Sequence, residues 1–252
     1  MLEHHSARAT PKDRTTLYYS LARNPSEIME AQRLRYQVFG EEMGARLSGH
    51  DRLDRDGFDA FCDHLLIRER ETQKVVGTYR ILSPSMASEA GGYYSSEEFD
   101  LSRIAHLFDR TVEVGRACVH PDYRTGSTIA LLWAGLAKYM IDNRYDTLIG
   151  CASISMADGG HLAASLYNKL KHEHLAPAEY RAFPRCPLPL QALRQDLPDP
   201  PCPALVKGYL RLGAWICGEP AWDPDFNSAD LLVMMPMSRI NPRYAAHFLK
   251  QA

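Results

Sequence analysis

The stretch TVEVGRACVHPDYRTGST (residues 111–128), which runs into IALLWAGLAKYM (129–140), decides the fold of this chain. Its first nine residues have the apolar character and alternation of a strand. Turn residues then interrupt the pattern, and an amphipathic helix is predicted over about 126–142. Such a junction points backbone N–H groups and a helix N-terminus at one spot, which favours binding of a phosphate-bearing ligand.

The predicted strand carries an acid, Glu113, and a base, Arg116, close to this turn. A charged pair beside an anion-binding turn provides what acyl transfer from a phosphopantetheine thioester needs. Glu113 is the candidate general base that takes a proton from an attacking amine, directly or through water. The alternative is a salt bridge within the strand. Strict alternation places the two side chains on opposite faces, so we expect Gly115 between them to host a bulge that re-aims one of them.

Composition sets limits on the class of protein. The chain has 252 residues, of which 45% are hydrophobic and 24% charged, as in an ordinary globular protein. Its formal net charge of −2 does not favour nucleic acid as a partner. The six cysteines form no CxxC pair, so neither a metal site nor a disulfide framework is predicted, and a reducing cytoplasm is expected. No apolar run has the length of a membrane span, although apolar helix faces leave peripheral contact with the inner membrane open.

The pattern of elements predicts an α/β protein with a mixed sheet and helices on both faces. Residues 1–15 are polar and expected to be flexible, and 16–252 are expected to form a single domain. The prolines between 176 and 203 predict a long ordered loop. The predicted strands cover residues 16–22, 62–68, 74–82, 111–119, 147–153, 205–217 and 230–235, and the predicted helices cover 24–44, 95–108, 126–142, 160–171 and 239–252.

Three arginines, Arg35, Arg80 and Arg116, lie on otherwise apolar elements. Arginine binds carboxylates and phosphates with two parallel hydrogen bonds, so one of them is a candidate for holding the carboxylate of an amino-acid substrate. A buried guanidinium otherwise needs an acidic partner. The segment 51–63 supplies candidates for such a structural network, or for binding a cationic substrate: Asp54, Asp56, Asp59 and Asp63. The same segment resembles a calcium loop only in part, because the later bidentate glutamate is missing.

The turn also resembles the acyl-CoA pyrophosphate loop of the GNAT-like N-acyltransferase superfamily, whose usual form is Val-x-Pro-x-x-Arg-Gly-x-Gly. Val119, Pro121, Arg124 and Gly126 match it, whereas the second glycine pair is missing. The departure leaves room for the carrier-protein version, in which only a pantetheine arm enters.

A closer resemblance covers an ordered series of short motifs between Arg35 and Gly126. The chain resembles the bacterial ornithine lipid biosynthesis N-acyltransferases, which are similar in the same elements to the acyl-homoserine-lactone synthases. The motifs are RYQVF (35–39), FD (58–59), DH (63–64), GTYRIL (77–82), FDL (99–101) and EVGR (113–116).

This resemblance implies a GNAT-like fold and transfer of a 3-hydroxyacyl chain from acyl carrier protein to the α-amine of L-ornithine, the first step of ornithine lipid synthesis. No cofactor is implied, since the acyl-phosphopantetheine thioester is itself a substrate. Alternative reactions are acylation of glycine, lysine or tyrosine, or acyl-homoserine-lactone synthesis from S-adenosylmethionine. A non-catalytic acyl-carrier or lipid-binding module is the alternative from another class.

The candidate site residues are chosen from their side-chain chemistry and from the family resemblance together. Tyr167 is similar in position to the superfamily tyrosine that protonates the departing thiolate, although a tyrosine on a helix face also suits a core position. A backbone N–H near Cys118 or Val119 would bind the oxyanion. The catalytic set is Glu113, Arg116 and Tyr167; the donor-binding set is Cys118, Val119, Arg124, Thr125, Gly126 and Ser127; the acceptor-binding set is Arg35, Asp59, Asp63, His64 and Arg80.

Overall fold

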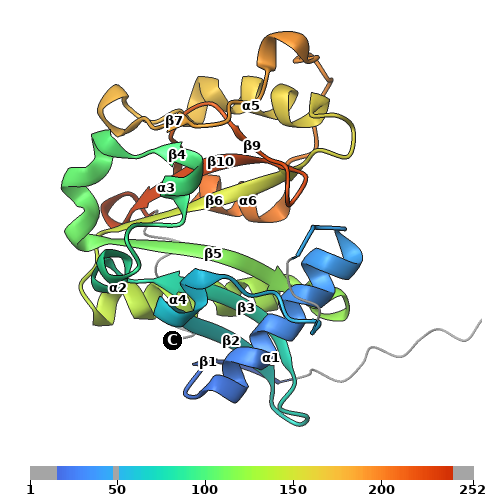
Figure 1. Ribbon diagram of the computed structural model, residues 1–252, viewed down its shortest axis with the longest axis vertical. Coiled ribbons are helices and arrows are strands. Elements are labelled where there is room, and N and C mark those ends of the chain that lie inside the picture. The colour runs from blue at the N-terminus through green and yellow to red at the C-terminus, as the bar shows by residue number, and fades with distance from the viewer. Residues whose placement is uncertain (1–15, 48–50, 241–252) are drawn as a thin grey trace, which may run out of the picture.

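A mixed sheet of eight strands is the centre of the computed structural model, which describes residues 16–47 and 51–240 (Figure 1). The strand order is β1-β2-β3-β5-β6-β10-β8, with β9 also paired to β10. The strands are β1 (Leu17–Leu21), β2 (Asp63–Glu69), β3 (Val75–Leu82), β5 (Thr111–Val119), β6 (Thr147–Ser155), β8 (Trp215–Ile216), β9 (Ala221–Asp223) and β10 (Ser228–Pro236).

Strands β5 and β6 form a parallel pair, and this pair is short. It holds three residue pairs, which end at Glu113 and Ile149, although both strands continue for several residues beyond that point. At Gly150 an added Cβ would lie 2.2 Å from the carbonyl oxygen of Val114, so only glycine allows the strands to approach where they begin to part. The sheet therefore opens between the second half of β5 and the second half of β6.

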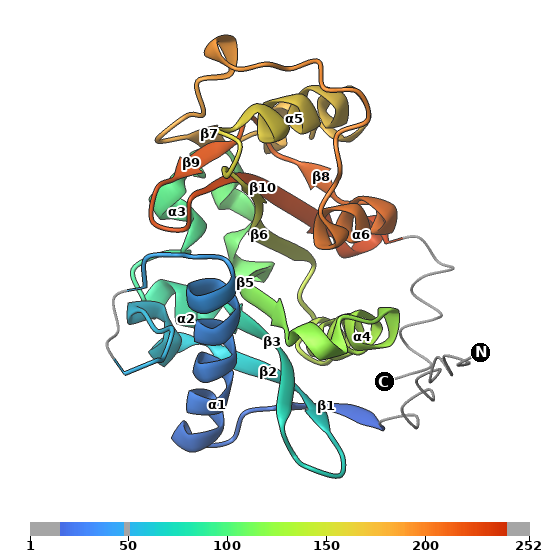
Figure 2. The ribbon, with the colours of Figure 1, turned by 90° about the vertical axis from the view of Figure 1, so that its right-hand side faces the viewer.

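Helices cover both faces of the sheet, and Figure 2 shows α1 and α4 on opposite sides of β2 and β3. The side chains of α4, α5 and α6 share one buried cluster, and those of α1 pack against the opposite face. Asn24 caps α1 by accepting a hydrogen bond from the N–H of Glu27, and a wider π-helical turn continues the helix over Tyr36–Glu42. The helices are α1 (Pro25–Arg35), α2 (Pro84–Glu89), α3 (Ser95–Glu98), α4 (Gly126–Asp142), α5 (His161–His174) and α6 (Ala204–Leu212).

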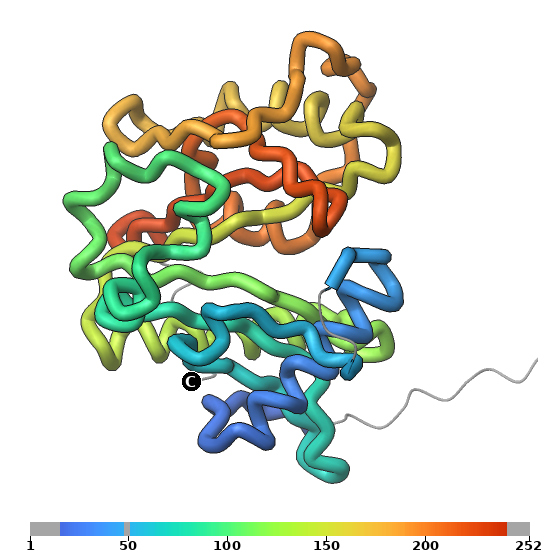
Figure 3. The backbone as a smooth tube through the Cα atoms, in the orientation of Figure 1, coloured from blue at the N-terminus to red at the C-terminus, as the bar shows by residue number. Residues whose placement is uncertain are grey.

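The segment between β3 and β5 connects the N-terminal strands β1–β3 to the C-terminal part of the chain. It includes the short strand β4 (Phe99–Asp100), which pairs with β7 (Phe183–Pro184) more than eighty residues later, and a 3₁₀ helix over Ser102–Arg110. Figure 3 shows this segment running beside the C-terminal half of the chain. Contacts between residues distant in sequence therefore position the start of α3 next to β5.

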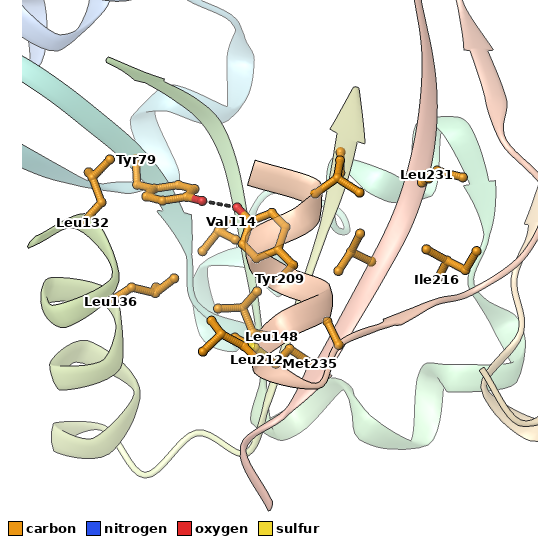
Figure 4. Close-up of a cluster of buried hydrophobic side chains, with 14 of the residues drawn as sticks. Tyr79, Val114, Leu132, Leu136, Leu148, Tyr209, Leu212, Ile216, Leu231 and Met235 are labelled. Atoms are coloured by element: carbon orange, nitrogen blue, oxygen red, sulfur yellow. Dashed lines mark hydrogen bonds between the residues drawn. The ribbon is translucent and has the colours of Figure 1, made fainter. Parts of the chain in front are cut away.

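The main hydrophobic cluster extends through both halves (Figure 4). Tyr79 on β3 and Tyr209 on α6 are buried, and their hydroxyl groups are hydrogen-bonded to each other. Leu132 and Leu136 of α4 lie beside Tyr79 in the same cluster. The hydrogen bond thus joins β3 to α6 beside the place where β5 and β6 part.

The predicted α/β class with helices on both faces is confirmed, as are the strand at 111–119 and the helix at 126–142. The helix predicted over 95–108 is wrong, because one helical turn, a strand and a 3₁₀ helix take its place. The strand predicted over 205–217 is wrong for most of its length, since its residues up to Leu212 belong to α6, and within this range Trp215–Ile216 form a strand. The predictions for 1–15 and for nearly all of 239–252 lie outside the described residues. In the described part of the chain, no helix combines the length and the apolar character needed to cross a bilayer.

Replacing Gly150 by alanine should destabilise the fold, since the new methyl group would overlap the backbone oxygen of Val114. Overpacking of this kind costs about 1–3 kcal/mol, and thermal unfolding should show a melting temperature lower by several degrees. Gly115→Ala is the matched control, because an added Cβ there meets no described atom within 4 Å. Equal melting temperatures for the two variants would contradict this account of the β5–β6 junction.

Candidate active site

Two cavities meet at the opening between β5 and β6. The first, the apolar cavity, has a volume of about 440 Å³ and is lined by the second half of β5, by Cys151–Ser153 of β6 and by the start of α6. The second, the polar cavity, has a volume of about 690 Å³ and lies between residues 54–58, α3 and residues 221–226. The residues that line both cavities are Phe58, Tyr94, Arg116, Asp223 and Phe226.

A buried ion cluster forms one wall of these cavities. Arg35 is fully buried, donates to Asp54 Oδ2 at 2.7 Å, and forms a bidentate pair with Asp59 at 2.7 and 2.9 Å. Asp59 keeps a lowered pKa: burial would raise it, and the hydrogen bonds and charge of Arg35 outweigh that effect. Of the two uses that the sequence left open for Arg35, the structure shows pairing with aspartates.

Arg80 and Arg116 complete the cluster around Asp56. Arg80 Nη1 lies 2.6 Å from one carboxylate oxygen of Asp56, and Arg116 Nη2 lies 3.0 Å from the other. The guanidinium of Arg116 also lies over the rings of Tyr94, at 5.1 Å, and Phe226, at 4.4 Å. Arg116 also lies 3.5 Å from Asp54, so two ion pairs and two cation–π contacts fix it at the boundary between the cavities.

A bulge in β5 brings Arg116 and Glu113 to the same cavity. Thr78 pairs with Cys118 and Arg80 with Gly115, so two residues of β5 lie opposite Tyr79 alone. The bulge was predicted at Gly115, and the residue with the left-handed backbone is instead Arg116, with φ of 50°. That conformation is unfavourable for a residue with a side chain, and the ion pairs and ring contacts of the guanidinium compensate for it.

Glu113 is buried at the start of the apolar cavity. Its carboxylate accepts hydrogen bonds from the backbone N–H groups of Tyr94, at 2.6 Å, and Ser95, at 2.7 Å, and from the hydroxyl of Ser95. Burial raises the pKa of Glu113, and the hydrogen bonds from Ser95 and Tyr94 oppose that rise only in part. A carboxylate with a raised pKa and a side open to a cavity is suited to accept a proton.

The residues predicted to bind the acyl donor lie along the other end of the apolar cavity. Cys118, Val119 and Arg124 line it, whereas 125–127 are absent from its described lining. Arg124 forms a bidentate pair with Glu42 at 2.6 Å, and Thr125 caps α4 through the N–H of Thr128. Burial raises the pKa of the Cys118 thiol to about 12, so this cysteine is protonated at neutral pH and is a poor nucleophile.

Three predicted residues are placed apart from the two cavities. Asp63 accepts a hydrogen bond from Tyr139 of α4 at 2.7 Å, and His64 is buried against the backbone oxygen of Asp59. Tyr167 lies in the main hydrophobic cluster, as its helix-face alternative suggested. The described residues that line the cavities include none of the three. The structure thus brings Arg35, Asp59, Arg80, Glu113 and Arg116 together, places His64 beside Asp59 at the back of the ion cluster, and leaves Asp63 and Tyr167 apart from it.

Three residues that the sequence did not single out also lie at the site, at the end of α3, on β6 and on β10. Glu98, Cys151 and Asp230 form a compact group whose carboxylate and thiol atoms lie within 4.8 Å of one another. Ser95 begins the segment predicted as a helix over 95–108, and its hydroxyl is bonded to Glu113 and lies 3.4 Å from Cys151 Sγ. The sequence feature that could have indicated this role is the Ser-Ser-Glu-Glu stretch at 95–98. A serine hydroxyl in such a stretch can donate to a buried carboxylate as well as cap a helix end.

Replacing Arg35 by methionine should strongly destabilise the protein, because two buried carboxylates lose their partner. Breaking a buried pair in this way costs about 3–5 kcal/mol, which urea unfolding will show as a lower midpoint or as failure to recover folded protein. Arg124→Met is the matched control: its pair with Glu42 is nearly half exposed, so the cost should stay within about 1 kcal/mol. Equal midpoints for the two variants would show that the Arg35 cluster does not stabilise the fold.

Comparison with known proteins identifies the family. A family model described as acetyltransferase (GNAT) domain matches residues 34–134. The L-ornithine N(alpha)-acyltransferase of Agrobacterium fabrum is 39% identical over 92% of this chain and 85% of its own, and that of Brucella abortus is 36% identical over 94% and 90%. The fold is also similar to that of the CoA-dependent acyl-homoserine lactone synthase BjaI, with a TM-score of 0.53, 16% identity, and coverage of 93% of this chain and 88% of that chain. The chain belongs to the L-ornithine N(alpha)-acyltransferase family.

Proposed function

We propose that this enzyme transfers a 3-hydroxyacyl chain from acyl carrier protein to the α-amine of L-ornithine. The observation that carries the proposal is the similarity over about nine-tenths of the chain to relatives named for this reaction. The two cavities support it, because an apolar cavity suits an acyl chain and a polar one suits a charged amino acid. They meet at Arg116 and Tyr94, beside which Glu113 lies.

The proposed donor site follows β5. Beyond Glu113 this strand has no pairing with β6, so the backbone groups that face the opening are available for the amides of a pantetheine arm. A backbone N–H near Cys118 or Val119 binds the oxyanion of the tetrahedral intermediate. The incomplete glycine pattern of the turn at 119–126 favours a carrier protein over CoA as the donor.

In the proposed reaction the ornithine α-amine attacks the thioester carbon. Glu113 takes a proton from the ammonium, directly or through water, and Arg116 helps to hold the acceptor beside it. The N–C bond forms, the C–S bond breaks, the departing thiolate takes up a proton, and one proton in all passes to solvent. The product carries an acyl chain, so we also propose that the cytoplasmic enzyme works at the inner membrane surface.

An acyl-transfer assay tests this function. Purified protein is mixed with 3-hydroxyacyl carrier protein and one amine at a time: ornithine, lysine, glycine, tyrosine or S-adenosylmethionine. We expect release of free thiol with ornithine above all, and the mass of an N-acylornithine. The same acyl group on CoA should be a poorer donor. Faster turnover with another amine would overturn the choice of acceptor, and no thiol release with any amine would favour a binding module.

Glu113→Gln should lower kcat/KM by about 10²- to 10⁴-fold, the usual contribution of a general base. Because the base acts when deprotonated and its pKa is raised, the wild-type rate should fall on acidification at a pH above the usual glutamate range. The variant should lack this acidic limb in a pH–rate profile. Glu89→Gln changes an exposed glutamate of α2 and serves as control. An unchanged rate and profile in Glu113→Gln would exclude Glu113 as the base.

A further inference from the structure

A group of carboxylates that has no cationic partner among residues 16–47 and 51–240 lies where the polar and apolar cavities meet. Glu98 comes from the end of α3 and lines the polar cavity, and Asp230 comes from β10 and lines the apolar one. Asp223 of β9 lines both. The carboxylates of Glu98 and Asp230 lie within 4.8 Å of each other and of the Cys151 thiol.

The carboxylates of Glu98 and Asp230 are shielded from solvent, and that of Glu98 is poorly satisfied. Both oxygens of Glu98 are inaccessible to solvent, and neither accepts a hydrogen bond of good geometry from the described residues. Asp230 is 3% exposed, accepts a hydrogen bond at 3.0 Å from the hydroxyl of Ser228, and is also hydrogen-bonded by the side chain of Ser153. Asp223 is half-buried and accepts hydrogen bonds from the N–H groups of Asp225 and Phe226. Two arginines that line the polar cavity with Glu98 are engaged elsewhere: Arg116 pairs with the aspartate cluster, and Arg185 donates to the backbone oxygen of Ser96.

Two buried carboxylates this close repel each other unless a proton or a cation lies between them. Burial raises the pKa of Glu98, and the neighbouring Asp230 raises it further. A primary ammonium has three donors, which match two carboxylates and a neighbouring serine hydroxyl. A metal ion fits less well, because burial keeps the pKa of the Cys151 thiol far above its usual range and the thiol therefore protonated.

The carboxylates of Glu98 and Asp230 also lie close to Glu113, the proposed general base. The Ser95 hydroxyl is bonded to Glu113 and lies 3.4 Å from Cys151, whose thiol lies within 4.8 Å of both carboxylates, so the side chains of Ser95 and Cys151 connect the proposed general base to the carboxylates. We propose that Glu98 and Asp230 bind the side-chain ammonium of a basic amino-acid acceptor while its α-amine lies at Glu113. This assignment rests on the proposed function and adds to it the two residues that select a diamino acid.

The test compares ornithine with norvaline, which has the same carbon chain but lacks the side-chain ammonium. In Glu98→Gln and Asp230→Asn, the ratio of kcat/KM for ornithine over norvaline should fall by about 10- to 100-fold, as expected for loss of a charged hydrogen bond. The fall should come mainly from a higher KM for ornithine, with norvaline turnover retained. Asp100→Asn, an exposed acidic neighbour that the described lining of neither cavity includes, should keep the wild-type ratio.

The outcomes separate this inference from the function on which it rests. An unchanged ratio in both active variants overturns the ammonium site alone, as does a stoichiometric divalent metal found by elemental analysis of the purified wild type. No turnover by the wild type with any amine overturns the proposed function instead. Glu98→Gln keeps the test decisive if Asp230→Asn does not fold, since Glu98 lies on a short helix at the edge of the core.

Discussion

The buried ion cluster around Arg35 is the interaction on which the site depends. It fixes the segment 54–59 against α1, and that segment in turn presents Asp56 to the guanidinium groups of Arg80 and Arg116. Three positive and three negative groups balance one another there, so the cluster can be buried without a net charge. Any free charge for a substrate must therefore come from outside it, and the carboxylates of Glu113, Glu98 and Asp230 are candidates.

The parting of β5 and β6 gives the site its two-sided character. The apolar cavity follows the part of β5 that is not paired with β6. The polar cavity lies between residues 54–58, α3 and residues 221–226. The shared wall contains Arg116, whose bulged backbone lets it reach the aspartate cluster and the rings of Tyr94 and Phe226. An acyl chain and an amino acid can thus approach one point from chemically different surroundings.

The elements near the N-terminus and in the middle of the chain were predictable because local signals agree with the final fold. Asn24-Pro25 starts a helix, and the pattern at 111–142 gives a strand, a turn and a helix. The strand predicted over 205–217 ignored Pro203 and Gly213, which border α6; Gly213 ends the helix with φ of 104°. Residues 95–108 do not form one continuous helix because β4 follows α3 directly and pairs with β7.

The site itself was predictable only in part. The pairing of Arg35 with aspartates follows from the cost of burying an unpaired charge, which sequence spacing already indicates. The grouping of Glu98 with Asp230 had no such signal, since these residues are far apart in the chain and meet only through the sheet and the β4–β7 pairing. The left-handed residue of the bulge is Arg116 rather than the predicted Gly115, because the contacts of the Arg116 side chain compensate for the strained backbone.

The hydrogen bond between Tyr79 and Tyr209 has a consequence for the length of chain that the apolar cavity accepts. Both residues line that cavity, and their hydroxyl groups satisfy each other away from water. A longer chain gains about 0.8 kcal/mol for each buried methylene. Forcing the two tyrosines apart would break this buried hydrogen bond, at a cost of about 1–3 kcal/mol. In the proposed function, in which the acyl chain enters this cavity, the pair therefore sets an upper limit to the accepted chain length.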